Sequence, residues 1–344
     1  MSASEKGTGP GESGKLSPQL SIVVPVYNEQ EILPAFHGRL TGVLSTIALR
    51  SEIIYVNDGS TDASLAFLMR LREDDPRIAV LDLSRNFGKE IALSAGLDHA
   101  AGNAVVVIDA DLQDPPELIP ELLEGLREGY DMVFGKRMGR RGEPLLKRVT
   151  ASLFYRLMRR LGTVAIPEDT GDFRALSRRA VEALKELEEQ HRFMKGLFAW
   201  IGYPQKAVPY ERLPRPAGRT KWNYWKLWNF ALEGITSFSS APLRVSTYMG
   251  LATALGAFFY ALYVILKTLL FGDPVKGYPS LMVVMLFLGG IQLMSLGIIG
   301  EYLGRMYIET KRRPLYFLNA HHPTRSLPGG GPLVRVQKDL GPAE

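Results

Sequence analysis

Apolar and mixed stretches alternate through the first part of the chain. The mixed stretches predict helices from Asn28 to about Ile47 and at Ala63–Arg72, Lys89–Ala101 and Pro116–Glu128. The short apolar runs predict five β-strands, at Leu20–Tyr27, Glu52–Val56, Ile78–Leu83, Val105–Ile108 and Asp131–Gly135. Strands and helices that alternate with short links predict an α/β fold with a mainly parallel sheet covered on both faces.

The pattern changes in the last third of the chain, where two long apolar stretches occur. Val245–Leu266 has 22 residues and Leu281–Gly300 has 20, and neither contains a charged residue. Each is long enough to cross a bilayer as a helix, and a buried hairpin of a soluble protein is the alternative. Basic residues flank the pair on both sides, so the positive-inside rule predicts that both flanks are cytoplasmic and that the short link is outside.

These patterns divide the chain into five parts. We expect a flexible tail at 1–18, a catalytic domain at 19–220, an interfacial helix at 221–243, a transmembrane hairpin at 244–304 and a cytoplasmic segment at 305–344, loose from about Asn319. Leu145–Leu161 predicts a basic amphipathic helix and Asn223–Phe238 an aromatic one, both suited to a membrane surface. An ordinary surface helix of the domain is the alternative for Leu145–Leu161.

Charge and cysteine content narrow the class of ligand. The net charge is +5, and the basic residues gather near the segments next to the apolar stretches. That distribution fits an anionic lipid surface or a phosphate ligand better than nucleic acid. The chain has no cysteine, which excludes disulfides and zinc–thiolate sites.

Polar side chains follow four of the predicted strands, at Tyr27–Glu29, Asn57–Ser60, Asp109–Asp114 and Lys136–Arg137. Ligands of parallel sheets bind at the carboxyl ends of the strands, so these groups should share one rim. Asp109 and Asp111 are two residues apart, which in an extended segment points both carboxylates the same way. They predict a Mg²⁺ or Mn²⁺ site that also holds phosphates, with an Asp-rich surface turn as the alternative. The glycine-rich dinucleotide and P-loop motifs are absent after the strands, so a nucleotide would be held in another way.

Seven motifs together resemble the membrane-anchored family 2 glycosyltransferases that load a sugar onto a polyprenyl phosphate. Dolichol-phosphate mannose synthases and bacterial undecaprenyl-phosphate glucosyl- or aminoarabinosyltransferases belong to this group. The resemblance covers about Leu20 to Arg313 and implies a GT-A (Rossmann-like) catalytic domain with interfacial helices and two C-terminal transmembrane helices. The motifs are PVYNE (25–29), NDGSTD (57–62), SRNFGKE (84–90), DADLQDPPE (109–117), GKR (135–137), EDTGDFR (168–174) and GRTKWNYWKL (218–227).

The resemblance also implies residue roles. Asp172 would lie at the reaction centre as an orienting residue or an optional base, and Arg174 would pair with it or hold the acceptor phosphate. A turn cap is the alternative for Asp58 and Asp172, and a solvated surface charge is the alternative for each cation. The remaining implied positions are Pro25, Tyr27, Glu29 and Asp58 for the base and ribose; Asp109 for ribose or metal; Asp111 and Gln113 for metal; and Arg137, Arg219 and Lys221 for the diphosphate or acceptor phosphate.

We therefore expect a metal-dependent, inverting transferase in the bacterial inner membrane, multi-pass, with its catalytic domain and both termini in the cytoplasm. The leading donor is UDP-glucose and the leading acceptor is undecaprenyl phosphate; GDP-mannose, UDP-4-amino-4-deoxy-arabinose or its formyl form, UDP-GlcNAc and UDP-Gal remain alternative donors. The loop Pro214–Trp222 would close over the diphosphate. A processive synthase would carry Q-x-x-R-W, whereas this chain has QHRFM at Gln190–Met194. A non-catalytic nucleotide-binding scaffold and a homo-oligomer stay open, and no nucleic acid partner is expected.

Overall fold

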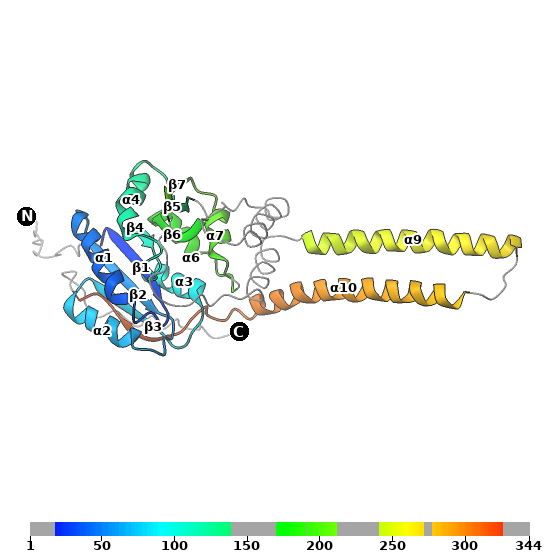
Figure 1. Ribbon diagram of the computed structural model, residues 1–344, viewed down its shortest axis with the longest axis horizontal. Coiled ribbons are helices and arrows are strands. Elements are labelled where there is room, and N and C mark those ends of the chain that lie inside the picture. Colours follow the sequence, from blue (N-terminus) through cyan, green and yellow to red (C-terminus); the bar gives the residue numbers. More distant parts are fainter. Residues whose placement is uncertain (1–17, 139–169, 191, 212–240, 272–276, 326–344) are drawn as a thin grey trace, which may run out of the picture.

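The protein consists of an α/β domain and a long two-helix arm that leaves it (Figure 1). The computed structural model describes residues 18–138, 170–190, 192–211, 241–271 and 277–325. The described strands form one sheet in the order β7-β5-β6-β4-β1-β2-β3-β8. Their bounds are β1 Leu20–Val26, β2 Ser51–Asn57, β3 Ile78–Leu83, β4 Ala104–Val107, β5 Met132–Arg137, β6 Thr170–Ser177, β7 Gln205–Tyr210 and β8 Leu318–His322.

Helices cover both faces of the sheet, as the sequence pattern predicts. One face carries α3, α6 and α7, and the other carries α1, α2 and α4. The five predicted strands and four predicted helices are confirmed, with ends shifted by a few residues. The helix bounds are α1 Leu33–Thr46, α2 Ser64–Asp74, α3 Lys89–His99, α4 Ile119–Arg127 (after a 3-10 turn, η1 Pro116–Leu118), α6 Arg178–Lys185 and α7 Met194–Trp200.

The predicted mainly parallel sheet is confirmed. Strands β1 to β5 and β7 run in one direction, and β6 and β8 run against them. Strand β6 lies between β4 and β5, so it begins at the rim where its neighbours end. The sequence pattern does not predict this strand, because polar residues interrupt its apolar positions although seven of its eight residues are buried.

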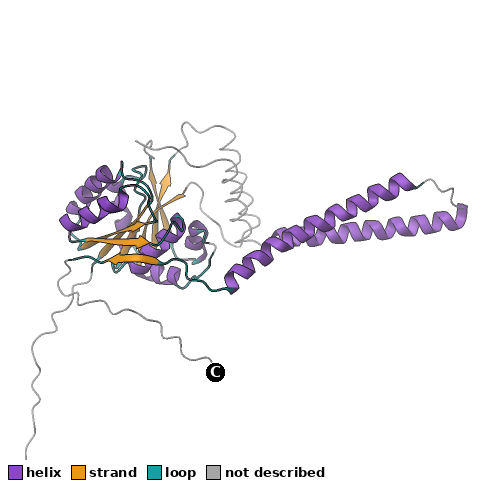
Figure 2. Cartoon of the chain, turned by 90° about the horizontal axis from the view of Figure 1, so that it is seen from below, coloured by secondary structure: helices purple, strands orange, loops and turns teal. Residues whose placement is uncertain are grey.

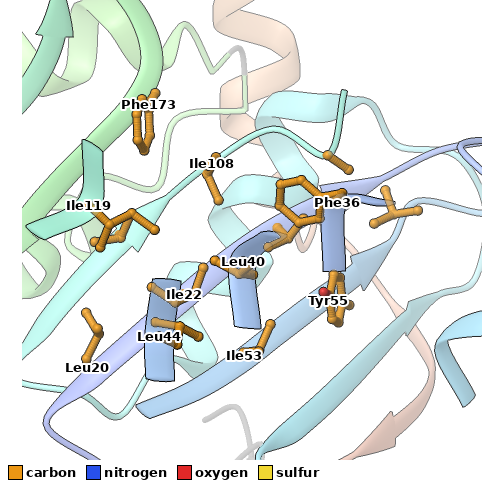
Figure 3. Packing of buried hydrophobic residues seen from close by; sticks show 14 of the residues in the cluster. Leu20, Ile22, Phe36, Leu40, Leu44, Ile53, Tyr55, Ile108, Ile119 and Phe173 are labelled. Carbon is orange, nitrogen blue, oxygen red and sulfur yellow. The ribbon is translucent and has the colours of Figure 1, made fainter. Parts of the chain in front are cut away.

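Large aliphatic and aromatic side chains fill the space between the sheet and α1 (Figure 3). Phe36, Leu40 and Ile22 are fully buried there, each worth about 1.5–3 kcal/mol by removal from water. Tyr55 is also buried, and its hydroxyl lies 3.0 Å from Nδ1 of His37. On the opposite face, α3 packs so closely on β1 that a Cβ at Gly96 would lie 2.2 Å from Val23 Cγ1. That contact fixes the helix whose first residue, Lys89, enters the site.

Both long apolar stretches are helical. They lie within α9 (Ala241–Phe271) and α10 (Tyr278–Thr310), which run side by side away from the sheet (Figures 1 and 2). By length and composition, one segment of the described helices, Phe287–Thr310, could cross a membrane. Two transmembrane crossings are therefore not confirmed. The predicted helices at 145–161 and 223–238 and the loop at 214–222 lie outside the described residues.

The expectation of a loose chain from Asn319 is wrong for residues 319–322. They belong to β8, which pairs antiparallel with β3 at the sheet edge. The segment LNAHH has no apolar run, so its own pattern does not predict a strand. Pairing with a strand more than 200 residues earlier in the chain, Val80 opposite His322, creates it.

Candidate functional site

A half-buried carboxylate, Asp109, and a buried one, Asp172, face each other at the rim. Val107 of β4 pairs with Arg174 of β6, and the same register continued by two residues sets Asp109 opposite Asp172. Lys89, the first residue of α3, joins them: its Nζ lies 2.6 Å from Asp109 Oδ2 and 2.6 Å from Asp172 Oδ2. Three elements that are distant in sequence therefore meet through one ammonium group.

The charges around Asp172 keep it ionised. Burial alone would raise the pKa of Asp172, but Lys89, Lys195 and the nearby Arg174 guanidinium hold that pKa well below its usual range. Burial would lower the pKa of Lys89, and the two carboxylates outweigh it and raise that pKa well above normal. A carboxylate that resists protonation in this way is a weak base, so the geometry suits Asp172 for orienting charge.

Asp109 differs from Asp172 in its titration. Burial raises the pKa of Asp109, with Lys89 opposing and Asp172 adding to the rise. One oxygen on each carboxylate, Asp109 Oδ1 and Asp172 Oδ1, is buried without a hydrogen-bond partner. Orphaned acceptors of this kind are satisfied by a cation or a donor group.

The predicted metal ligands share one loop after β4. Asp111 Oδ1 accepts a hydrogen bond from the Gln113 backbone at 3.1 Å, and Leu112 between them has φ 56°, a left-handed conformation that is rare for leucine. Within the described residues, no three His, Cys, Asp or Glu side chains are grouped to hold a metal. Carboxylate and amide oxygens together with the orphaned Asp109 Oδ1 nevertheless suit a hard divalent ion.

Arg137 reaches the same rim from the end of β5. Its Nε donates to the Tyr210 hydroxyl at 3.3 Å, and its guanidinium lies 3.9 Å from Asp114 Oδ1. Tyr210 in turn donates to Asp114, which is buried. The guanidinium passes so near Gly171 that a Cβ there would lie 2.8 Å from it, so glycine leaves the space that this arginine occupies.

Arg174 turns into the protein. Its guanidinium stacks 3.6 Å from the centre of the Phe198 ring and donates to the Gly171 carbonyl at 2.9 Å. Burial lowers the pKa of Arg174 to about 10, against the opposing effect of Asp172 and Glu90. The described contacts therefore support the start of β6, and the acceptor-phosphate role of Arg174 stays a prediction.

The loops that follow β1 and β2 interlock. Asn28 has φ 54°, its backbone donates to Ser60 Oγ at 3.1 Å, and its own Oδ1 accepts from the Thr61 backbone at 2.8 Å. The residues that the resemblance assigns to the nucleotide, Pro25, Tyr27 and Glu29, lie on this part of the chain. Pro25 is half-buried and Tyr27 is exposed. The geometry of the proposed base pocket thus depends on the β1–β2 contact.

Asp58 caps the loop that leads to Lys89. Its buried carboxylate accepts from the backbone nitrogens of Phe87 at 2.7 Å and Gly88 at 3.0 Å. Burial raises the pKa of Asp58, and these two hydrogen bonds oppose the rise. Asp58 thus caps the loop before α3, a loop distant from its own turn, and contact with the base stays a prediction.

Gly59 provides a test of this loop. It has φ 64°, and a Cβ would lie 2.5 Å from backbone atoms of Arg85 and Asn86. We expect Gly59→Ala to lower the unfolding free energy by more than about 1 kcal/mol, because the loop carrying Lys89 must move. The same movement should impair the sugar transfer expected from the motifs. Gly129→Ala is the matched control: φ is 98° there and nothing lies within 4 Å of the added Cβ. Equal losses in both variants, measured by thermal unfolding and turnover, would contradict the steric argument.

Three charged residues of this cluster have no role predicted from the sequence: Lys89, Glu90 and Lys195. The first two lie in the SRNFGKE motif and begin a helix directly after a strand, which is a signal that could have marked them. Burial and Asp172 raise the pKa of Glu90 to about 8, with Lys89 and Lys195 opposing the rise. Lys195 lies on α7, and nothing in its local sequence indicates the site. Arg219 and Lys221 lie outside the described residues.

Two segments of the chain match known protein families. Residues 21–185 match glycosyl transferase family 2, and residues 241–306 match the GtrB C-terminal hairpin. An uncharacterized glycosyltransferase of Synechocystis is 56% identical over 301 residues, 88% of this chain and 95% of that protein. The chain therefore belongs to glycosyltransferase family 2 and is a glycosyltransferase, as its motifs predicted.

Two further proteins give more detail on the relatives. The bactoprenol glucosyl transferase of Shigella phage SfII is 50% identical over 304 residues, 88% of this chain and 98% of that protein. The structure of glucosyl-3-phosphoglycerate synthase from Mycobacterium tuberculosis with Mn²⁺, UDP-glucose and phosphoglyceric acid has a TM-score of 0.44 and 22% identity, covering 64% of this chain and 78% of that one.

Proposed function

We propose that this protein transfers one sugar, glucose from UDP-glucose, to undecaprenyl phosphate at the cytoplasmic face of the bacterial inner membrane. The observation that carries the proposal is the Lys89 bridge between Asp109 and Asp172 at the rim of a family 2 sheet. Relatives named bactoprenol glucosyl transferase, similar over nearly their whole length, support a polyprenyl phosphate as the acceptor and glucose as the sugar.

The state of Asp172 fits a phosphate acceptor. A hydroxyl acceptor needs a base to remove its proton, whereas a phosphate oxygen is already anionic at neutral pH. Because Lys89 and its neighbours keep the pKa of Asp172 low, this carboxylate is poorly suited to take up a proton. We assign Asp172 the role of an ionised group that orients charge where acceptor and donor meet, with Lys89 held between it and Asp109.

The reaction is a single displacement. A phosphate oxygen of the acceptor forms a bond to the anomeric carbon while the bond from that carbon to the nucleoside diphosphate breaks, which inverts the centre. Negative charge then grows on the departing diphosphate, and fixed cations nearby stabilise it. Arg137, held by Tyr210 and Asp114, is the described cation best placed at the strand ends for this task.

Asp109, Asp111 and Gln113 would hold Mg²⁺ or Mn²⁺. A bound divalent ion supplies charge neutralisation on the diphosphate. Asp109 brings the buried oxygen that lacks a partner, and the turn made by Asp111 and Gln113 sets the other ligands on the same loop.

The two-helix arm supports action at a membrane. The acceptor's phosphate lies at the headgroup layer, so the rim must be held there. Helices α9 and α10 carry long apolar stretches, and the exposed aromatic and aliphatic side chains along them suit lipid contact. With α10 crossing the bilayer and α9 as its antiparallel partner, both ends of the arm lie on the cytoplasmic side, as the basic flanks indicate.

A panel of donors tests the proposal. We expect purified full-length protein with undecaprenyl phosphate to transfer glucose from UDP-glucose, giving a lipid-linked product with an inverted anomeric centre by NMR. Chelation should stop turnover, and added Mg²⁺ or Mn²⁺ should restore it. If another nucleotide sugar were preferred, that sugar and not UDP-glucose would be the donor. The alternatives in the panel are GDP-mannose, UDP-GlcNAc, UDP-Gal and UDP-4-amino-4-deoxy-arabinose. Turnover with a non-lipid acceptor alone would overturn the proposal, and nucleotide binding without any transfer would favour a scaffold.

A further inference from the structure

The chain beyond α10 returns to the catalytic domain and packs along it. We define residues 314–325 as the return segment; Figure 1 shows it passing beside the sheet. The Tyr316 hydroxyl donates to Asp98 Oδ2 at 3.0 Å, and the Ser84 backbone donates to the Phe317 carbonyl at 2.9 Å. Just before it, the Gln190 backbone donates to Glu309 Oε1 at the end of α10 at 2.9 Å. The arm is thus fastened to the domain on the side of α3 and α7.

A bulge in the edge strand directs one side chain of the return segment toward the site. In the β3–β8 pair, Asp82 lies opposite Ala320 and Leu83 opposite Leu318, which leaves Asn319 as an extra residue. Bulges re-aim a side chain from its regular position in a strand. Here Asn319 Nδ2 donates to Asp82 Oδ2 at 2.8 Å.

Asp82 passes the contact to the strand that ends at the rim. It is a buried carboxylate, and its other oxygen, Oδ1, accepts from Asn57 Nδ2 at 2.7 Å. Asn57 is the last residue of β2 and is 1% exposed. Both oxygens of Asp82 therefore have amide donors, one from the domain and one from the return segment.

The contacts continue to the loops proposed to hold the nucleotide. Asn57 Oδ1 accepts from the Ser60 backbone at 3.2 Å, and Ser60 Oγ accepts from the Asn28 backbone at 3.1 Å. Asn28 stands between Tyr27 and Glu29, and Asn57 directly precedes Asp58. A continuous series of hydrogen bonds thus joins Asn319 to both of the loops proposed to hold the nucleotide, the one after β1 and the one after β2.

We propose that Asn319 is a positioning residue for the donor nucleotide, acting through Asp82 and Asn57, so that the strand after the two-helix arm forms part of the donor site. The inference rests on the proposed function and on the roles that the family resemblance implies for Tyr27, Glu29 and Asp58, the residues after β1 and β2 that would hold the base and ribose. Without the Asn319 amide, one oxygen of a buried carboxylate loses its donor, and Asp82 must turn or admit water to recover one. Either change removes the constraint that orients Asn57 and the loop beyond it.

Nucleotide affinity separates this role from a purely structural one. We expect Asn319→Ala and Asn319→Asp in the full-length protein to raise the UDP dissociation constant about fivefold, the equivalent of one lost hydrogen bond. The KM for the donor should rise to match, while kcat and the KM for the acceptor change little. Tyr316→Phe is the control, because it removes a hydrogen bond of the same return segment to Asp98 and leaves the series from Asn319 intact.

An exchanged pair tests direct contact. In Asp82→Asn with Asn319→Asp, the new amide can still accept from Asn57 and donate to the new carboxylate, so UDP affinity should recover relative to Asn319→Asp alone. If Asn319→Ala and Asn319→Asp lower the unfolding midpoint as Tyr316→Phe does but leave UDP affinity unchanged, the inference is wrong. Wild-type protein that binds no nucleotide would reject the proposed function itself, which is a separate failure.

Discussion

Replacing Lys89 by methionine should lower kcat/KM about 100-fold, or about 2.7 kcal/mol of transition-state stabilisation. Methionine keeps much of the apolar stem but removes the charge that lies 2.6 Å from both Asp109 and Asp172. The two carboxylates then face each other without a cation between them, and an uncompensated charge of this kind is costly when the group is buried. Both substrates should bind more weakly, since the carboxylates would swing apart or take up a proton.

The pH dependence of activity should also change in the Lys89 variant. In the wild-type protein the pKa of Asp172 lies below its usual range, so the carboxylate stays ionised as the pH falls. Without Lys89, burial raises that pKa with only Lys195 and Arg174 in opposition, so activity should disappear at a higher pH than in the wild type. Lys206→Met is the control, because Lys206 pairs with Glu128 on the surface of β7. If the Lys89 variant kept the wild-type rate and lost activity at the same pH as the wild type, Lys89 would have no role in the site.

Replacing Asp111 by asparagine should reduce turnover at least about 100-fold and weaken the response to Mg²⁺ and Mn²⁺. Asparagine retains an oxygen that can accept from the Gln113 backbone, so the turn at Leu112 should survive. The variant therefore isolates the charge of the side chain from its structural hydrogen bond. A metal titration of turnover, together with thermal unfolding, measures both effects.

Glu117→Gln is the matched control for the Asp111 variant. Glu117 lies six residues further along and pairs with Arg39 in an exposed ion pair, which contributes less than about 1 kcal/mol. We expect its turnover and metal response to match the wild type. Activity in Asp111→Asn that resists chelators and equals the wild type would show that Asp111 does not hold the metal.

Much of the fold could be predicted from local pattern. The runs around Val24, Ile54 and Val106 are apolar without a break because both faces of a parallel strand are covered, and this signal lies within each segment. The same reasoning located the rim, since the carboxyl ends of such strands share an edge. The sequence pattern alone places the Asp109 and Asp111 loop and Arg137 at that edge.

Strands β6 and β8 could not be predicted in this way. In β6, Asp172 and Arg174 point to the face that carries α7, where Phe198 covers Arg174, and Phe173 points to the other core. These polar residues are buried because partners from other elements satisfy them, and a local pattern does not contain those partners. Strand β8 exists only by pairing with β3.

By itself, the sequence determined the class of fold, the rim of strand ends and the family of enzyme, because these follow from periodicities and motifs within short segments. Only the tertiary structure decided that Lys89 joins Asp109 to Asp172, that Asp58 caps the neighbouring loop, and that Asn319 reaches Asp82. Each of these contacts joins residues that are at least 20 positions apart in the chain. Their distance and direction depend on strand register and helix packing, which arise only when the whole sheet has formed.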